Sequence, residues 1–156
     1  MIRSVQYVLL LGLLSTSFVA FGQENKNIHD RSICAPDGIA LGRYDLVSYY
    51  LPNGPVQGLD TIYAEHDGLT YLFVSEDNKA SFLRDPKRYL PTYLGWCSTN
   101  LAMGRLACPD YRNFKIENDR LLLFEHAGFT NGRDIWNTDP ARHREMADDN
   151  FARFSQ

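Results

Sequence analysis

The sequence predicts an α+β fold, in which a small antiparallel sheet of hairpins packs with short helices in a single domain. Two observations lead to this prediction. Runs of strand-forming residues flank short turn sequences, and helix-starting residues stand between and after those runs. Strands that come in hairpin pairs and alternate with short helices are typical of the α+β class. We find no internal repeat in the sequence and no low-complexity segment.

Two hairpins are predicted from turn chemistry. Residues 61–66 and 69–74 are rich in strand formers and flank Asp67-Gly68. A tight hairpin turn requires positive φ at its centre, which Asp and Gly adopt readily. The second hairpin joins residues 114–117 to 121–124 through Asn118-Asp119-Arg120. We expect the strands of each pair to run antiparallel.

Four helix or turn starts are predicted from capping residues. Ser75 is a predicted N-cap, and Asp85-Pro86 and Asp139-Pro140 each combine a capping carboxylate with a proline at the first helical position. Asp45 is interpreted as the cap of a short segment, residues 46–51, because its carboxylate can accept from free backbone N–H groups.

Two longer helices are expected in the second half of the chain. Residues 91–103 are predicted to form one helix, ended by Gly104. The helix that starts at Asp139-Pro140 has an apolar face with the spacing i, i+4, i+7, made by Ala147, Phe151 and Phe154.

The composition excludes several classes of protein. Hydrophobic residues are 44% and charged residues 22%, which is ordinary for a globular domain, and 13% aromatic residues argue against disorder. The net charge of −3 gives no basic face, so a nucleic-acid partner is not expected. No second long apolar stretch exists, so a multispanning membrane protein is excluded.

Residues 1–22 are predicted to be a signal peptide. Arg3 precedes an apolar core at residues 7–14, and Ala20-Phe21-Gly22 is a small-x-small cleavage pattern. The apolar core is shorter than the ~20 residues of a membrane span. We therefore favour cleavage over an uncleaved anchor, and expect no membrane span after it. Residues 23–38 follow as a polar, loosely packed lead-in.

The chain has three cysteines, Cys34, Cys97 and Cys108. In an oxidising compartment neighbouring thiols pair, and an odd number leaves at least one without a partner in the chain. There is no Cys-x-x-Cys pair, which removes the thioredoxin-type motif and the zinc sites that need such spacing.

Four segments, residues 40–50, 68–75, 78–91 and 93–97, resemble the YHS domain family in their order and spacing. The similarity is to the exported bacterial branch, and extends over about residues 39–152. It implies a YHS-like domain at residues 39–154, in a protein of the bacterial periplasm or secreted from the cell. The branch implies no settled activity.

The resemblance does not carry over the family's cysteine-based metal site. Its broader relatives have a cysteine where this chain has Ser48, and a cysteine can follow the strand where this chain has Val74. In the exported branch, a cysteine after Gly-aromatic is usual, and the matching residue here is Cys97. The resemblance therefore implies redox or soft-metal chemistry at Cys97.

Cys97 is the leading candidate for a functional residue, and a buried structural role is the alternative. Near a helix start, free N–H groups would stabilise its thiolate form. His66 and His126 each lie near the end of a predicted strand, and either could complete a soft N/S site with Cys97 for copper or, less favoured, zinc.

Three functions stay open. The first is soft-metal binding through Cys97, the second is a thiol redox role for Cys97, and the third is a ligand- or protein-interaction module without chemistry. No enzyme motif is found, so a binding or accessory protein is favoured over an enzyme.

Because Cys97 matches the family position, Cys34 and Cys108 look like additions of this chain, and we predict that they form a disulfide. The bond would leave Cys97 as the one free thiol. Its Cα atoms must lie within ~7 Å.

Overall fold

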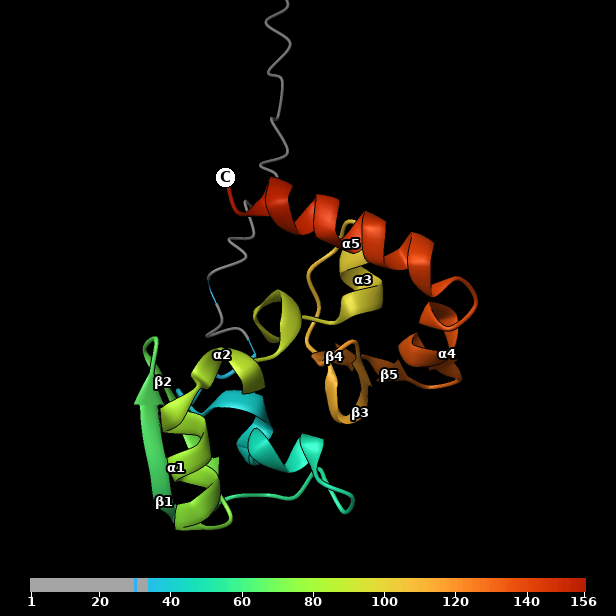
Figure 1. The fold of residues 1–156 in the computed structure, drawn as a ribbon. Helices are drawn as coiled ribbons and strands as arrows, with labels where there is room; N and C mark the ends of the chain where they lie inside the picture. Colours follow the sequence, from blue (N-terminus) through green and yellow to red (C-terminus); the bar gives the residue numbers. More distant parts are fainter. Residues whose placement is uncertain (1–29, 31–33) are drawn as a thin grey trace, which may run out of the picture.

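The computed structural model describes Asp30 and residues 34–156 (Figure 1). The predicted signal peptide and most of the predicted lead-in lie outside the described residues. The predicted α+β class is confirmed, because the chain folds into short helices and small antiparallel two-stranded sheets. Of the helices in the described part, none is both long enough and apolar enough to cross a membrane.

The elements form two consecutive groups, which we call the first unit (residues 39–90) and the second unit (residues 91–154). The first unit contains the 3-10 helices η2 (Ala40–Arg43) and η3 (Val47–Tyr50), then β1 (Leu59–His66), β2 (Leu69–Phe73), α1 (Glu76–Arg84) and α2 (Pro86–Tyr89). The second contains η4 (Thr92–Gly95), α3 (Ser98–Ala102), β3 (Asp110–Glu117), β4 (Arg120–Phe124), β5 (His126–Ala127), β6 (Thr130–Asn131), α4 (Gly132–Trp136) and α5 (Pro140–Phe154). In Figure 1, β1, β2, α1 and α2 lie on one side and β3, β4, α4 and α5 on the other.

Both predicted hairpins are confirmed. β1 pairs antiparallel with β2 around Asp67-Gly68, where φ is 47° and 74°. β3 pairs antiparallel with β4 around Asn118-Asp119, where φ is 53° and 58°. Gly, Asn and Asp adopt positive φ at the least cost, so these turns follow from local chemistry alone.

The predicted helix starts are confirmed as well. α1 begins after Ser75, α2 after Asp85 and α5 after Asp139, and the side chains of Ser75 and Asp139 accept from backbone N–H groups of their helices. The apolar face predicted for α5 packs on the core, with Ala147 fully buried.

The prediction of one helix over residues 91–103 is wrong. Tyr93 and Leu94 have φ of 58°, and Trp96 is extended, so the chain makes the 3-10 turn η4 and then the separate five-residue helix α3. Tyr93 is buried in the core and its hydroxyl donates to Asp148 of α5 at 2.8 Å. Tertiary contacts therefore hold a backbone conformation that the helical pattern of the sequence did not predict.

The structure contains a repeat that the sequence does not show. In η2, Leu41 and Gly42 have φ of 55° and 54°, and in η4 Tyr93 and Leu94 have φ of 58° and 58°. Each pair precedes an extended aromatic residue, Tyr44 or Trp96. The two stretches thus follow the same path with different residues.

The hairpins continue the correspondence. The β1–β2 register has an irregularity between Leu59 and Tyr63, and the β3–β4 register has one between Asp110 and Phe114. A helix with a fully buried aromatic residue then follows each hairpin, with Phe82 in α1 and Trp136 in α4. After each of these helices comes Asp-Pro and a further helix.

β4 lies between two hydrophobic cores. Leu121 and Leu123 belong to the core of the first unit, whereas Leu122 and Phe124 belong to the core of the second. Successive side chains of a strand point to opposite faces, so β4 is buried on both. This explains why residues 121–124 are a continuous apolar run.

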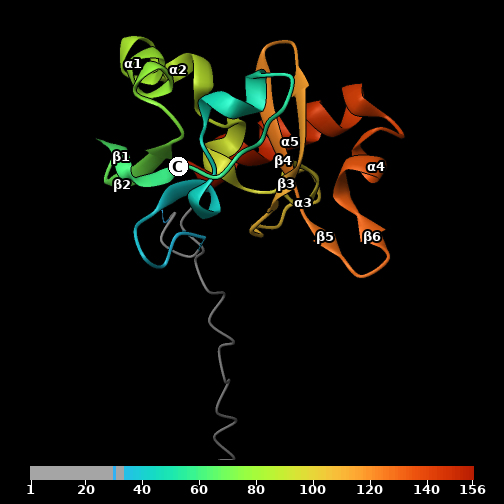
Figure 2. The ribbon, with the colours of Figure 1, turned by 90° about the horizontal axis from the view of Figure 1, so that it is seen from below.

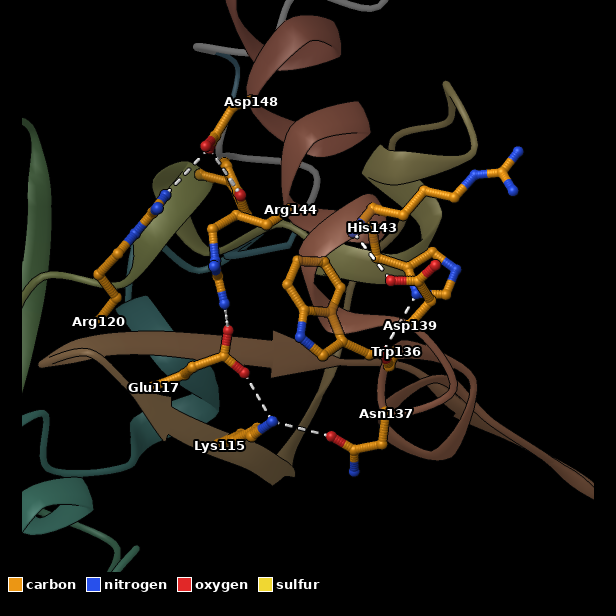
Figure 3. Close-up of polar contacts among 11 residues, drawn as sticks. Lys115, Glu117, Arg120, Trp136, Asn137, Asp139, His143, Arg144 and Asp148 are labelled. Carbon is orange, nitrogen blue, oxygen red and sulfur yellow. Dashed lines mark hydrogen bonds and ion pairs between the residues drawn. The ribbon is translucent and has the colours of Figure 1, made fainter.

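Charged contacts hold α5 against the β3–β4 hairpin (Figure 3). The Glu117 carboxylate pairs with Arg144 of α5 and lies 2.6 Å from the Lys115 ammonium. Arg120 of β4 donates to Asp148 of α5 at 3.1 Å. These ion pairs hold α5 in place. The first unit has no helix of this length after its Asp-Pro, since α2 has only four residues.

Trp136 stands at the centre of the second core and is fully buried. The ring of His143 in α5 stacks on it with 5.9 Å between centroids, and Nδ1 of His143 lies 3.1 Å from the Trp136 carbonyl oxygen (Figure 3). His143 is thereby part of the packing between α4 and α5.

The predicted disulfide is confirmed. Cys34 is bonded to Cys108, with 5.4 Å between the Cα atoms. Within residues 34–38 of the predicted lead-in, Pro36 and Asp37 are exposed, whereas Ala35 is buried and the Gly38 carbonyl accepts from the Thr70 N–H of β2 at 2.9 Å. The disulfide and this pairing with β2 together fix the segment.

Candidate thiol site

Cys97 is the free cysteine of the chain, and its side chain is fully buried. It follows the extended residue Trp96 and is the N-cap residue of α3. Its backbone N–H donates to the Ala107 carbonyl at 2.9 Å, which fixes it beside the segment that leads into β3. The expectation that Cys97 lies within a long helix is therefore wrong, since the residue caps a short one.

Three N–H groups converge on the sulfur of Cys97. The backbone N–H of Asn100 lies 3.5 Å from Sγ and the side-chain amide of Asn100 lies 3.2 Å from it. The backbone N–H of Glu125 donates at 3.1 Å. Hydrogen-bond donors from two segments that are directed at one acceptor fix the position of the sulfur between α3 and the end of β4.

Asn100 and Glu125 also line a small open pocket beside the thiol. The Asn100 amide donates to the Glu125 carboxylate at 2.7 Å as well as to Sγ. The remaining lining residues of this pocket are Thr99, Met103, Arg105, Thr130, Gly132 and Ile135. The pocket is thus linked to the sulfur through two residues that contact both.

The sequence did not single out Asn100 or Glu125. Asn100 stands three residues after Cys97, the spacing at which an N-cap side chain meets a helix N–H, and this spacing was the available signal. Glu125 carries no such signal, because it lies 28 residues away and meets the sulfur only when β4 is in place.

His66 is half-buried at the edge of the first unit's core. Its ring contacts Tyr71 and Phe82 with centroid distances of 6.4 and 5.6 Å, and Nε2 lies 3.4 Å from the Asp67 carboxylate. These contacts belong to the first unit, whereas Cys97 lies in the second. The neighbours of His66 in the fold are therefore Tyr71, Phe82 and Asp67 of the first unit.

His126 is exposed in β5 and directly follows Glu125, whose N–H reaches the sulfur. Within residues 34–156, the N–H groups on the sulfur come from Asn100 and Glu125 and not from either histidine. The same residues contain no group of three or more His, Cys, Asp or Glu side chains placed to hold a metal ion.

Asp45 is a cap, as predicted, and it also makes contacts that the sequence did not indicate. Its carboxylate is fully buried and accepts from the backbone N–H groups of Val47 at 2.8 Å and Ser48 at 3.3 Å. It further accepts from the Val74 N–H at 2.9 Å and the Asn78 amide at 2.6 Å. Val74 and Asn78 lie 29 and 33 residues away, so only the folded chain shows that they meet Asp45.

Comparison with known proteins gives no match, since no family model, curated protein or solved structure matches this chain. The resemblance to the YHS domain family stays a prediction.

Proposed function

We propose that this chain is an exported thiol redox protein of the YHS type, in which Cys97 reacts with small oxidants such as hydrogen peroxide. The observation that carries the proposal is the convergence of three N–H groups on Sγ. The Cys34–Cys108 bond supports export to an oxidising compartment, for which we propose the bacterial periplasm or the extracellular medium.

The reaction has two steps. The Cys97 thiolate attacks one peroxide oxygen, the O–O bond breaks, and the departing oxygen takes up a proton, which gives Cys97 sulfenic acid and water. Two molecules of an external thiol then return the sulfenic acid to the thiol, through a mixed disulfide, and release water and their own disulfide. The N–H groups stabilise the thiolate before attack.

Burial of Cys97 sets the class of oxidant. The sulfur is fully buried behind Asn100 and Glu125, so a peroxide of the size of hydrogen peroxide is favoured over a bulky organic peroxide. The neighbouring pocket shares Asn100 and Glu125 with the surroundings of the sulfur, so an oxidant bound there would be separated from Cys97 by these two residues.

The test is a trapping experiment on the full chain, purified without reductant from the cell envelope. Hydrogen peroxide is added with a dione reagent that captures sulfenic acids, and the adduct is located by mass spectrometry. We expect one adduct, at Cys97, in the wild type and none in Cys97→Ser. A wild-type Cys97 that stays unmodified, at peroxide concentrations that oxidise an unfolded control of the same chain, would contradict the proposal.

Copper binding through Cys97 is the second candidate, and one observation favours it. His126 directly follows Glu125, whose backbone N–H donates to the sulfur, and this makes it the histidine candidate for a site with Cys97. The redox proposal ranks first because N–H groups already occupy the acceptor positions of the sulfur, and a metal ion would have to displace them.

Elemental analysis of reduced protein decides on copper. Stoichiometric copper that is lost in both Cys97→Ser and His126→Ala would support this site. His66→Ala is the matched control, because the His66 ring contacts Phe82 of the first unit, and this variant should keep the metal. Wild-type protein that carries no copper after exposure to cuprous ion would refute it.

A further inference from the structure

Asp45 and Cys97 take the same place in the two units. Each follows the left-handed turn and an extended aromatic residue, and each precedes a short helix. The backbone N–H of Asp45 donates to Val56 at 2.8 Å, and that of Cys97 donates to Ala107 at 2.9 Å. The two residues are therefore equivalent by backbone path as well as by hydrogen bonding.

Their side chains also join the same two parts of each unit. The Asp45 carboxylate accepts from N–H groups at the start of η3 and from Val74, the first residue after β2. The Cys97 sulfur accepts from the Asn100 N–H in α3 and from Glu125, the first residue after β4. A side-chain amide completes both sets, from Asn78 in the first unit and from Asn100 in the second.

From this correspondence we infer that the two units are copies of one duplicated unit, and that positions 45 and 97 hold its hydrogen-bond acceptor. At position 97 the sulfur links the short helix to the end of the hairpin, as the carboxylate does at position 45. We call this set of hydrogen bonds the tie. A carboxylate can therefore replace the sulfur without loss of the tie. The thiol is then a specialisation of the second unit and not a requirement of its fold. This inference holds whether or not Cys97 reacts with oxidants.

Two neighbours differ between the two positions. The side-chain amide comes from Asn78 of α1 in the first unit but from Asn100 of α3 in the second, and Glu125 stands where the first unit has Val74. Val74 is uncharged, whereas Glu125 carries a carboxylate. That carboxylate accepts from the side-chain amide of Asn100, which also donates to the Cys97 sulfur. A second carboxylate at position 97 would be repelled by Glu125. The substitution is therefore made as Cys97→Asp with Glu125→Gln, and compared with Glu125→Gln alone.

Hydrogen exchange at the backbone amide of residue 125 reports the tie directly, because this amide donates to Sγ. Cys97→Val/Glu125→Gln is the matched control, since valine fills the space and accepts no hydrogen bond. We expect this amide to exchange roughly tenfold faster in the valine variant than in Glu125→Gln, as the loss of a buried acceptor implies. In Cys97→Asp/Glu125→Gln the rate should stay within about threefold of Glu125→Gln.

The opposite outcome overturns the inference. It is wrong if the aspartate variant exchanges as fast as the valine variant, or if the aspartate variant fails to fold while the valine variant folds.

The reciprocal exchange at position 45 gives a second test, in a region that the proposed chemistry does not use. Asp45→Cys should protect the backbone amide of Val74 better than Asp45→Val does, because sulfur can accept from it. Equal loss of protection in both variants would show that the positions are not equivalent. Peroxide trapping at Cys97 is measured on the wild type, so failure of either proposal leaves the result for the other intact.

Discussion

The first and second units share a backbone and differ in chemistry. The first ties its helix to its hairpin with the Asp45 carboxylate, and the second uses the Cys97 sulfur. The buried helix aromatic is Phe82 in the first and Trp136 in the second. In both units a left-handed turn places one buried acceptor between the short helix and the end of the hairpin, and the two units differ in which residue supplies that acceptor.

The second unit also carries additions. One residue, Val74, separates β2 from the N-cap Ser75, whereas the β5–β6 hairpin separates β4 from the N-cap Asn131. Figure 2 shows this hairpin at the edge of the molecule, away from β1 and β2, and Phe129 at its turn is fully exposed. The inserted segment borders the pocket beside Cys97, so the additions and the thiol lie together.

The largest expected effect is at the acceptor of the first unit. Asp45→Ala leaves four buried or half-buried donors without their acceptor, and should lower the free energy of unfolding by more than about 3 kcal/mol. Cys97→Ala removes a weaker acceptor with three donors and should cost about 1–3 kcal/mol. Urea unfolding of the full chain measures both.

Asp45→Asn is the matched control, because it keeps the shape but turns an NH₂ donor toward other donors. It should resemble Asp45→Ala. If it unfolds like the wild type, the carboxylate is not the feature that defines the unit.

Removal of the disulfide should have the next largest effect, and the bond has no counterpart in the first unit, where Gln57 takes the place of Cys108. The bond closes a span of 74 residues that runs from the lead-in to the start of β3. The chain-entropy model gives such a loop about 4 kcal/mol, less any strain. Cys34→Ser/Cys108→Ser should therefore lower the free energy of unfolding by about 2–4 kcal/mol. A change too small to measure would mean that core packing alone holds the lead-in to the second unit.

High pH should weaken the fold through buried tyrosines of both units. Burial raises the pKa of Tyr50 in the first unit to about 12, and burial with the Asp148 contact raises the pKa of Tyr93 in the second well above its usual range. The raised values mean that the folded state keeps its protons where the unfolded chain loses them. The contribution of these tyrosines to stability should thus be constant below pH ~10 and fall above it.

Denaturant midpoints from pH 9 to 11 check this expectation. Tyr50→Phe should reduce the slope above pH ~10, because phenylalanine does not titrate. A midpoint that rises over this range would show that the tyrosines titrate in the folded state first.

A smaller effect is expected at Trp136. Its indole Nε1 is buried and makes no hydrogen bond to any described residue. Trp136→Phe therefore removes no hydrogen bond and recreates the residue type of Phe82, but it leaves a small cavity in the core, so it should cost about 1–2 kcal/mol. A loss as large as the 3–5 kcal/mol typical of Trp→Ala would show that the two helix aromatics are not interchangeable.

The smallest effect is expected at the inserted hairpin. Phe129 is fully exposed, so Phe129→Ser should change stability by no more than about 0.5 kcal/mol. Thermal unfolding of the two proteins side by side checks it. A clear loss of stability would show that Phe129 makes a contact in the folded chain. The β5–β6 hairpin would then contribute to stability and would not be a mere addition in place of Val74.

Local chemistry by itself determined much of the fold. Asp67-Gly68 and Asn118-Asp119 set the two hairpins, because few other residues accept positive φ so readily. Ser75, Asp85-Pro86 and Asp139-Pro140 set three helix starts, because capping acts over three residues. The Cys34–Cys108 pair followed from the number of cysteines and a resemblance.

Tertiary structure decided the rest, because the deciding contacts join residues far apart in the chain. The helical pattern of residues 91–103 gave way to a left-handed turn at Tyr93, whose hydroxyl meets Asp148 across 55 positions. The duplication is not detectable in the sequence, because two segments can follow the same backbone path with different residues. The path requires only side chains of suitable size and one hydrogen-bond acceptor in each unit. For the same reason the sequence could nominate Cys97 but not Asn100 and Glu125, which reach the sulfur only after β4 and α3 have packed together.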